Sequence, residues 1–145
     1  MGIELENIID KALRIACVAH AGQVDKGGAP YILHPLRLAM SFHDTTLQVV
    51  ALLHDVVEDS KVTLDGLRDV GFSDAIVSAV DALTRRKDET YDDFIDRAAR
   101  NHIAVQVKIE DLKDNMDVTR LDILTKDDLN RLVKYKNAYT FLKLF

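Results

Sequence analysis

The chain has 145 residues, of which 48% are hydrophobic and 30% are charged, and its formal net charge is −5. This length and composition are typical of one folded domain with its own core, and they exclude a disordered chain. The acidic balance argues against nucleic acid or an anionic membrane as a partner, because both bind basic patches. A small anionic substrate is still compatible, since a bound metal can make a local pocket positive.

Residues 1–6 lack the basic segment and apolar run of a secretory signal, and no apolar stretch approaches the length of a membrane span. We therefore expect a cytoplasmic protein. The single cysteine, Cys17, excludes an internal disulfide. Its apolar neighbours favour a small core residue over a reactive thiol.

Two helices are expected in the first part of the chain. Apolar residues recur at intervals of three and four between about Leu5 and Ala21, and Gly22 suits a helix end. The glycines and the proline of residues 23–30 indicate a loop. A second helix is expected from about Pro35 to His43, where most residues are apolar.

His34 lies between the only two prolines of the chain, Pro30 and Pro35. Their fixed backbone angles would hold this histidine in one orientation. The position does not identify a metal ligand by itself. It gains weight only from the ionisable residues that follow in the central segment.

The central segment runs from Leu47 to Asp59. Its first seven residues are mostly apolar, which predicts an element buried nearly all round. A helix would bring the ionisable residues that follow near one face, whereas a strand would send His54 and Asp55 to opposite faces. The length of the segment favours one helix, although its four valines favour a strand. The four ionisable residues are His54, Asp55, Glu58 and Asp59.

Buried charges cost several kcal/mol unless they are paired or bound to a metal. A bound metal is the simplest compensation for the four ionisable groups of the central segment. The alternative is a core helix end whose polar groups meet solvent or a cap.

Three more helices are expected after the central segment: Thr63 to Val70, a helix capped by Ser73 through about Leu83, and Tyr91 to Arg100. Residues 84–89 form a charged loop between the last two. This loop is either a solvated turn or a cationic rim above an anionic ligand.

The segment Ile103–Ile109 alternates apolar and other residues, which slightly favours a strand. If it is helical instead, Val107, Asp111 and Asn115 lie on one stripe. The last segment, about Lys126 to Phe145, indicates a long helix whose first turn carries acidic residues that suit the positive helix end.

The candidate ligands occur in the order H…HD…D, which resembles the HD-domain metal-dependent phosphohydrolases. Within that group, three stretches resemble the Rel/Spo homologue family. Residues 22–35 resemble the opening of its hydrolase domain, residues 51–59 match its HDxxED block almost letter for letter, and residues 107–116 resemble its third block. The resemblance joins three spaced motifs and covers most of the chain.

This resemblance implies an all-α fold, with residues 1–145 forming a single HD-type helical bundle, and so overrides the strand signal at Ile103–Ile109. Because the chain ends at Phe145, it looks like a free-standing small alarmone hydrolase. The implied reaction removes the 3′-pyrophosphate from (p)ppGpp with Mn²⁺ and leaves GDP or GTP.

The resemblance also implies roles for individual residues. Glu58 and Asp59 would orient the attacking water and take its proton, and which of the two accepts it is left open. Two imidazoles and two carboxylates suit a borderline divalent ion. The implied metal ligands are His34, His54, Asp55 and Asp111.

Substrate contacts are implied for five further residues. Lys26 matches a lysine that meets phosphate, and Asn115 matches an asparagine near the ribose or base. Arg131 and Tyr135 have the spacing of an Arg/Tyr pair that touches nucleotide in animal members. Tyr31 either lines the pocket or packs in the core.

Four positions depart from the family pattern and leave the base and phosphate preference open. Each change removes a positive charge or a base contact near an anionic substrate, and Arg85, Arg86 and Lys87 would compensate if their loop reaches the pocket. The departures are Asp25 for arginine, Leu112 for arginine, Asp114 for histidine and Asp117 for arginine.

Three other functions were weighed against ppGpp hydrolysis. One is hydrolysis of another nucleotide, such as ppApp or the 2′-phosphate of NADPH. Another is a nucleotide-binding regulator without turnover, which would not need the acid pair. The last is a helical interaction module, which does not explain charges within the apolar central segment. The sequence does not indicate an oligomeric state.

Overall fold

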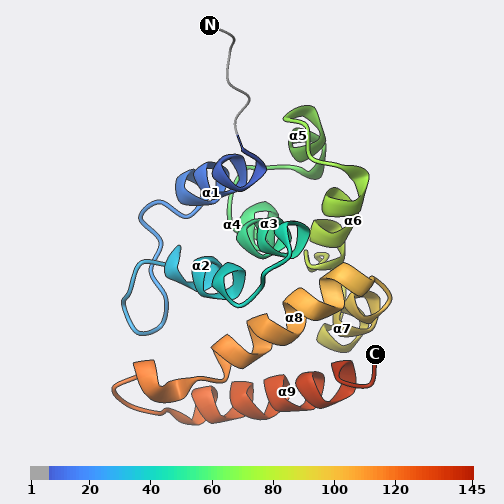
Figure 1. Cartoon of the computed structure of the whole chain (residues 1–145). Coiled ribbons are helices and arrows are strands. Elements are labelled where there is room, and N and C mark those ends of the chain that lie inside the picture. The colour runs from blue at the N-terminus through green and yellow to red at the C-terminus, as the bar shows by residue number, and fades with distance from the viewer. Residues whose placement is uncertain (1–6) are drawn as a thin grey trace, which may run out of the picture.

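The structure is a computed structural model that describes residues 7–145, which form helices and turns and contain no strand (Figure 1). An isolated β-bridge joins Val24 and Pro30 within the loop that precedes the second helix. The all-α prediction is therefore confirmed. The helices are α1 Ile8–Ala19, α2 Leu33–Met40, α3 Thr45–Leu53, α4 Val56–Asp59, α5 Leu64–Asp69, α6 Asp74–Ala82, α7 Tyr91–Ala99, α8 His102–Asn115, the 3₁₀ turn η1 Val118–Arg120 and α9 Lys126–Leu142.

Helix α3 is the centre of the fold, with α1, α2, α6 and α8 packed against it (Figure 1). All five residues from Val49 to Leu53 are buried, as the apolar run predicted. The side chain of Asp44 caps the helix by accepting a hydrogen bond from the backbone N–H of Leu47. This packing carries the end of α3, and the residues that follow it, into the interior.

The prediction of one continuous helix from Leu47 to Asp59 was wrong. The chain turns at His54 and Asp55, which separate α3 from the single turn of α4. The backbone at Asp55 has φ −108° and ψ −3°, and the His54 ring bonds the carbonyl of Ala51. His54 and Asp55 therefore project from a break, where their side chains meet residues from other helices.

Helix α8 explains the misleading strand signal at Ile103–Ile109. It lies between two hydrophobic clusters: Ala104 and Val107 pack with α1–α6, whereas Val105 and Leu112 pack with α7 and α9. A helix that is buried on two sides carries apolar residues on both of them. Along the sequence these apolar residues alternate with other residues, as they would in a strand. The side chain of Asn101 caps the helix by accepting from the N–H groups of residues 103 and 104.

The other helices begin close to the predicted positions, with Thr63, Ser73 and Thr90 as side-chain caps of α5, α6 and α7. Two predictions need correction. Cys17 is exposed, because α1 turns its Ala12 and Ala16 face toward α3 instead. Leu5, the expected start of the first helix, lies outside the described residues.

Among the described helices, none combines the length and apolar character needed to cross a bilayer.

Replacing Leu112 by alanine should lower the free energy of unfolding by about 2–5 kcal/mol, because this α8 side chain is fully buried against α7 and α9. Urea unfolding followed by circular dichroism measures the change. Leu129→Ala is the matched control, since Leu129 is 48% exposed on α9 and should change stability by no more than about 0.5 kcal/mol. Equal losses in both variants would contradict this packing.

Candidate metal centre

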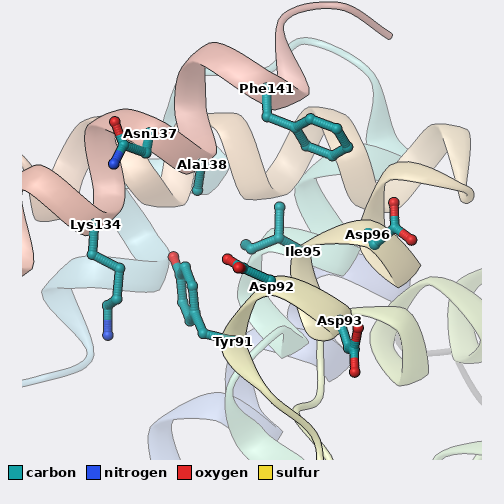
Figure 2. A pocket seen from close by; sticks show the side chains of 9 residues that line it. All are labelled: Tyr91, Asp92, Asp93, Ile95, Asp96, Lys134, Asn137, Ala138 and Phe141. Atoms are coloured by element: carbon teal, nitrogen blue, oxygen red, sulfur yellow. The ribbon is translucent and has the colours of Figure 1, made fainter.

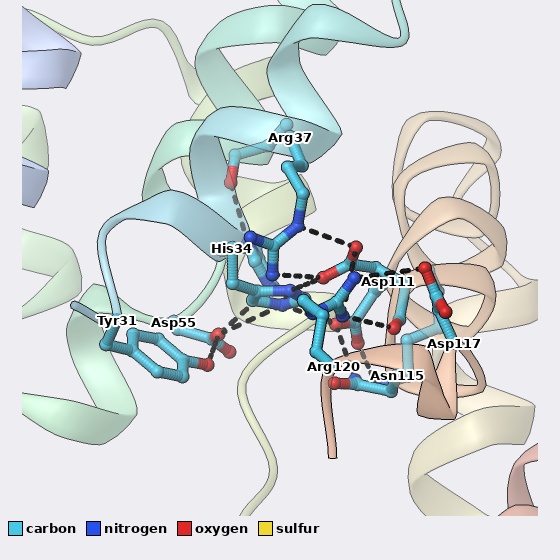
Figure 3. A network of polar contacts seen from close by, with 12 residues as sticks. Tyr31, His34, Arg37, Asp55, Asp111, Asn115, Asp117 and Arg120 are labelled. Carbon is cyan, nitrogen blue, oxygen red and sulfur yellow. Dashed lines mark hydrogen bonds and ion pairs between the residues drawn. The ribbon is translucent and has the colours of Figure 1, made fainter. Parts of the chain in front are cut away.

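Three segments that are distant in sequence meet at one buried point. His54 comes from the break after α3. His34 comes from the first turn of α2, Asp55 from the same break as His54, and Asp111 from α8 (Figure 3). The Nε2 atom of His34 lies 2.8 Å from Oδ1 of Asp111, and Nε2 of His54 lies 3.5 Å from the same oxygen. One ligand atom from each of His34, His54 and Asp111 lies within 4.8 Å of the others, so the three could hold a metal ion.

Asp55 completes this cluster. Its Oδ2 atom is 3.0 Å from Nε2 of His54 and 3.9 Å from Nε2 of His34. The hydroxyl of Tyr31 donates a hydrogen bond to the same oxygen and so orients the carboxylate. The four predicted metal ligands are thus together.

The His54 ring indicates that the cluster suits a cation. Its Nδ1 atom bonds the carbonyl oxygen of Ala51 at 2.6 Å and must therefore carry a proton. The buried Nε2 atom has no hydrogen-bond partner and faces the carboxylates of Asp55 and Asp111. Burial is the largest influence on this ring and opposes its protonation, but Asp55 and Asp111 together outweigh burial and raise the pKa of His54 well above its usual range. A divalent cation would displace the Nε2 proton and bind the freed lone pair together with both carboxylates.

Both oxygens of Asp111 are held in place. Oδ1 accepts from Asn115 Nδ2 at 3.0 Å, and Oδ2 accepts from the ammonium of Lys108 at 2.7 Å. Burial would raise the pKa of Asp111, but Lys108 and the two histidine rings keep it well below its usual range. The carboxylate is therefore ionised, as a metal ligand must be.

The predicted acid pair lies next to the cluster, on α4. Glu58 accepts a hydrogen bond from the backbone N–H of Arg85 at 2.5 Å. Burial raises the pKa of Glu58 and, with the nearby charge of Asp55, also raises the pKa of Asp59. Carboxylates with raised pKa values accept protons more readily than ordinary ones, which is useful for a general base.

A cavity of about 370 Å³ opens beside the cluster and includes the His34 ring in its wall. A smaller pocket of about 60 Å³ adjoins it, and the two share Lys26, Asn115 and Tyr135. Tyr31 lines the larger cavity and Arg131 lines the smaller one. All five predicted substrate residues therefore border one or both of these two pockets.

Another cavity of comparable size lies elsewhere in the described chain. It measures about 440 Å³ and lies between α7 and α9, bordered by Tyr91, three aspartates and Phe141 (Figure 2). None of the candidate metal ligands lines it. Size alone therefore does not locate the site, and the buried cluster of ionisable groups does.

Comparisons with known proteins agree with the motifs, although no family model matches the chain. A probable GTP pyrophosphokinase of Mycobacterium leprae is 34% identical over 127 residues, which cover 79% of this chain and 16% of the relative. A guanosine-3′,5′-bis(diphosphate) 3′-pyrophosphohydrolase of Vibrio cholerae is 37% identical over 75 residues, or 49% of this chain and 10% of the relative. The enzyme of the same name from Aquifex aeolicus is 29% identical over 122 residues, which cover 74% of this chain and 17% of that relative.

The chain is a Rel/Spo homologue. It spans no more than about a sixth of the length of these three relatives. A solved structure described as a metazoan orthologue of SpoT that hydrolyses ppGpp has a TM-score of 0.78 at 20% identity, and the match covers 97% of this chain and 88% of that one. This likeness shows that the chain shares that fold.

The departures from the Rel/Spo pattern have structural partners. Asp114 accepts from Nδ1 of His34 at 2.6 Å and forms two hydrogen bonds with the guanidinium of Arg37, at 2.8 and 2.9 Å. Asp117 pairs with Arg120 at 3.1 Å. Burial would raise the pKa of Asp114, but His34 and Arg37 hold it far below its usual range. The carboxylate thus fixes the proton of His34 on Nδ1 and turns Nε2 toward the cluster.

Two other Rel/Spo departures are also explained. Leu112 faces away from the cavity into the core, where an arginine could not be neutralised. Asp25 accepts from the backbone N–H groups of Gly27 and Ala29 and so shapes the loop that carries Lys26. Gly27 is needed in that loop, since a Cβ atom there would lie 2.9 Å from the carbonyl oxygen of Arg120.

Sequence reasoning missed the residues that support the cluster. It treated Asp114 only as a lost positive charge and assigned no role to Arg37 or Lys108. The spacing gave one usable signal for Lys108, which lies three residues before Asp111 and so shares its helix face. No local signal connects Arg37 with Asp114, because their contact spans 77 residues.

Asp114→Asn should weaken binding of a divalent cation at this cluster by about 10- to 100-fold, because the carboxylate that orients the His34 ring loses its charge. Isothermal titration with Mn²⁺ measures the affinity, and the ¹⁵N shifts of His34 report the position of its ring proton. Asp117→Asn is the control, since Asp117 pairs with Arg120 and Thr119 and not with His34. Unchanged metal affinity and ring shifts in Asp114→Asn would refute the orienting role.

Proposed function

We propose that the chain is a divalent-metal-dependent hydrolase that removes the 3′-diphosphate from guanosine tetra- and pentaphosphate, releasing pyrophosphate and GDP or GTP. The observation that carries this proposal is the buried convergence of His34, His54, Asp55 and Asp111 beside an acid pair. The names of the Vibrio cholerae and Aquifex aeolicus relatives support the choice of reaction.

The donor set fits a borderline divalent ion, for which we propose Mn²⁺, held by His34, His54, Asp55 and Asp111. When bound, such an ion polarises phosphate oxygens and lowers the pKa of a coordinated water. The surrounding chain keeps the site dry: His34, His54 and Asp111 are each at most 4% exposed. Electrostatic interactions are stronger in such a site than in bulk water.

The residues of the chain account for the proton and bond balance. Glu58 and Asp59 take a proton from the attacking water, whose oxygen forms a new bond to the phosphorus attached to O3′. The bond between this phosphorus and O3′ breaks, and O3′ takes a proton from solvent as GDP or GTP leaves. The backbone N–H of Arg85 fixes the Glu58 carboxylate, so the base is positioned before the substrate arrives.

The nucleoside is proposed to occupy the cavity beside the cluster. Lys26 would contact phosphate, and Asn115 would reach the ribose or base while its amide also bonds Asp111. Tyr135 and Arg131 border the inner end of this space and would contact the base. Tyr31 is proposed to act chiefly through Asp55, to which its hydroxyl is bonded.

A second candidate substrate is another phosphorylated nucleotide, such as ppApp or the 2′-phosphate of NADPH. The observation that favours it is the presence of three carboxylates in the cavity wall, those of Asp25, Asp114 and Asp117. Acidic groups in the wall disfavour a second terminal diphosphate, which favours NADPH, whose 2′ substituent is a monophosphate; ppApp carries the same two diphosphates as ppGpp and differs from it only in the base. Parallel assays with Mn²⁺ and ppGpp, ppApp or NADPH decide between these substrates.

We further propose that residues 1–145 form one HD-type catalytic domain that acts in the cytoplasm on a small nucleotide. The net charge of −5 supports a small-molecule substrate over nucleic acid or an anionic membrane.

The double variant Glu58→Gln, Asp59→Asn should keep metal binding and lose at least about 100-fold in kcat, because no carboxylate is left to take the proton. Pyrophosphate release from ppGpp measures kcat, and isothermal titration measures metal binding. The control is Asp92→Asn, Asp93→Asn, which changes the same residue type on α7, remote from the metal ligands. Wild-type turnover in the Glu58/Asp59 variant would disprove the acid-pair assignment.

Removal of the metal with a chelator should abolish hydrolysis and lower the midpoint of thermal unfolding, because the buried carboxylates lose their compensating charge. Re-addition of Mn²⁺ at about 100 times its Kd should restore about 2.7 kcal/mol of stability. His54→Ala should remove this response, while His43→Ala, at an exposed histidine before α3, should retain it. A response in His54→Ala equal to that of wild type would argue against the site.

A further inference from the structure

Two cations from different elements meet at the ring of Tyr91, the first residue of α7. The ammonium of Lys134, on α9, lies 4.5 Å from the ring centroid, and the guanidinium carbon of Arg85 lies 5.7 Å from it. In Figure 2 the Lys134 side chain extends beside the Tyr91 ring. Contact with an aromatic face restricts where each cation can go, so the two charges are held near each other.

Neither cation is neutralised. Within residues 7–145, Lys134 and Arg85 form no ion pair with a carboxylate, whereas neighbouring Arg131 pairs with Asp128 and Lys108 with Asp111. Burial, and then the nearby charges of Arg85 and other cations, lower the pKa of Lys134. Positive charges gathered without counter-ions, in a chain of net charge −5, are a feature expected of an anion-binding site.

The position of this pair relative to the metal centre is fixed by hydrogen bonds. The backbone N–H of Arg85 bonds the Glu58 carboxylate, so Arg85 lies next to the acid pair. Arg97 secures the same loop by donating to the carbonyls of Asp81 and Thr84 and to the Glu89 carboxylate. The loop therefore holds Arg85 beside the acid pair, and the Tyr91 ring brings Lys134 of α9 to Arg85.

The pair is also separate from the proposed nucleoside pocket. Neither Arg85 nor Lys134 lines the cavity beside His34 or the small pocket that adjoins it. A substrate with its nucleoside in that cavity and its reacting phosphorus at the cluster would extend its outer phosphate beyond the metal centre. The backbone of Arg85 is bonded to Glu58, and its guanidinium shares the Tyr91 ring with Lys134, so both cations would be on the acid-pair side of such a substrate.

We propose that Arg85 and Lys134 bind the outer phosphate of a 3′-diphosphate and so make the site select 3′-diphosphate over 3′-monophosphate substrates. This inference rests on the proposed function and deepens it. Tyr91 is the positioning residue, since its ring contacts both cations. The outer phosphate carries the charge that a monophosphate lacks, so the pair interacts with one class of substrate and not with the other.

Arg85 and Lys134 also compensate for the positive charges that are lost at the positions departing from the Rel/Spo pattern. Leu112 is fully buried, so that position cannot supply a charge to the substrate. Asp25 and Asp117 are committed to loop and ion-pair contacts. Arg85 and Lys134 come from elements outside the three family motifs and provide positive charge from the α7–α9 side instead.

Steady-state kinetics with Mn²⁺ test the proposal on two substrates, guanosine 5′-diphosphate 3′-diphosphate and guanosine 5′-diphosphate 3′-monophosphate. Lys134→Ala should raise KM for the 3′-diphosphate about tenfold, with kcat within about twofold, and leave the 3′-monophosphate unaffected. Arg85→Ala should act in the same direction, and Lys134→Arg should retain the wild-type KM. Lys136→Ala is the matched control, because Lys136 lies on the same helix and contacts Tyr139 instead.

Equal effects of Lys134→Ala on both substrates, or the same KM as in Lys136→Ala, would overturn the selective role. If the wild-type chain hydrolyses neither substrate, the proposed function fails, and binding of inorganic pyrophosphate in the presence of Mn²⁺ still tests the anion site. Isothermal titration should then show about tenfold weaker pyrophosphate binding in Lys134→Ala than in Lys136→Ala. Identical pyrophosphate affinities would refute the anion site independently of turnover.

Discussion

The structure depends on one electrostatic constraint: two imidazoles and two carboxylates share a buried point at the end of an apolar helix. Burial makes each charge costly, so every ionisable group there needs a partner. Lys108 holds one oxygen of Asp111, and Tyr31 holds Asp55. His54 Nε2 alone has no hydrogen-bond partner within the cluster. The supporting contacts therefore converge on one place where a cation is the missing partner.

The break between α3 and α4 is what allows this convergence. A continuous helix would have kept His54 and Asp55 on the surface of one cylinder, four residues from Glu58 and Asp59. At the break, His54 turns back to the carbonyl of Ala51 and faces α2 and α8, while α4 carries the acid pair toward the 84–90 loop. The candidate metal ligands and the acid pair are thus adjacent, although each group is held in place by different partners.

Features encoded within a few residues were predictable from the sequence. Asp44 and Ser73 cap helices because their side chains reach N–H groups three residues ahead, and the apolar run before His54 is buried as its composition indicated. The failures involve distant contacts. Residues 103–109 resemble a strand because α8 is packed on two sides, and Cys17 is exposed because only one face of α1 meets α3. The bond between Asp114 and Arg37 spans 77 residues, so local pattern could not reveal it.

The distribution of charge shows how an acidic chain can still accept an anionic substrate. A carboxylate repels phosphate only to the extent that its charge is uncompensated, and Asp114 and Asp117 have guanidinium partners while Asp25 accepts two backbone N–H groups. Lys134 and Arg85, by contrast, have no carboxylate partner within residues 7–145. The net charge of the chain therefore does not predict the local charge at the site. What a phosphate encounters depends on which charges remain unpaired, and near the acid pair those charges are positive.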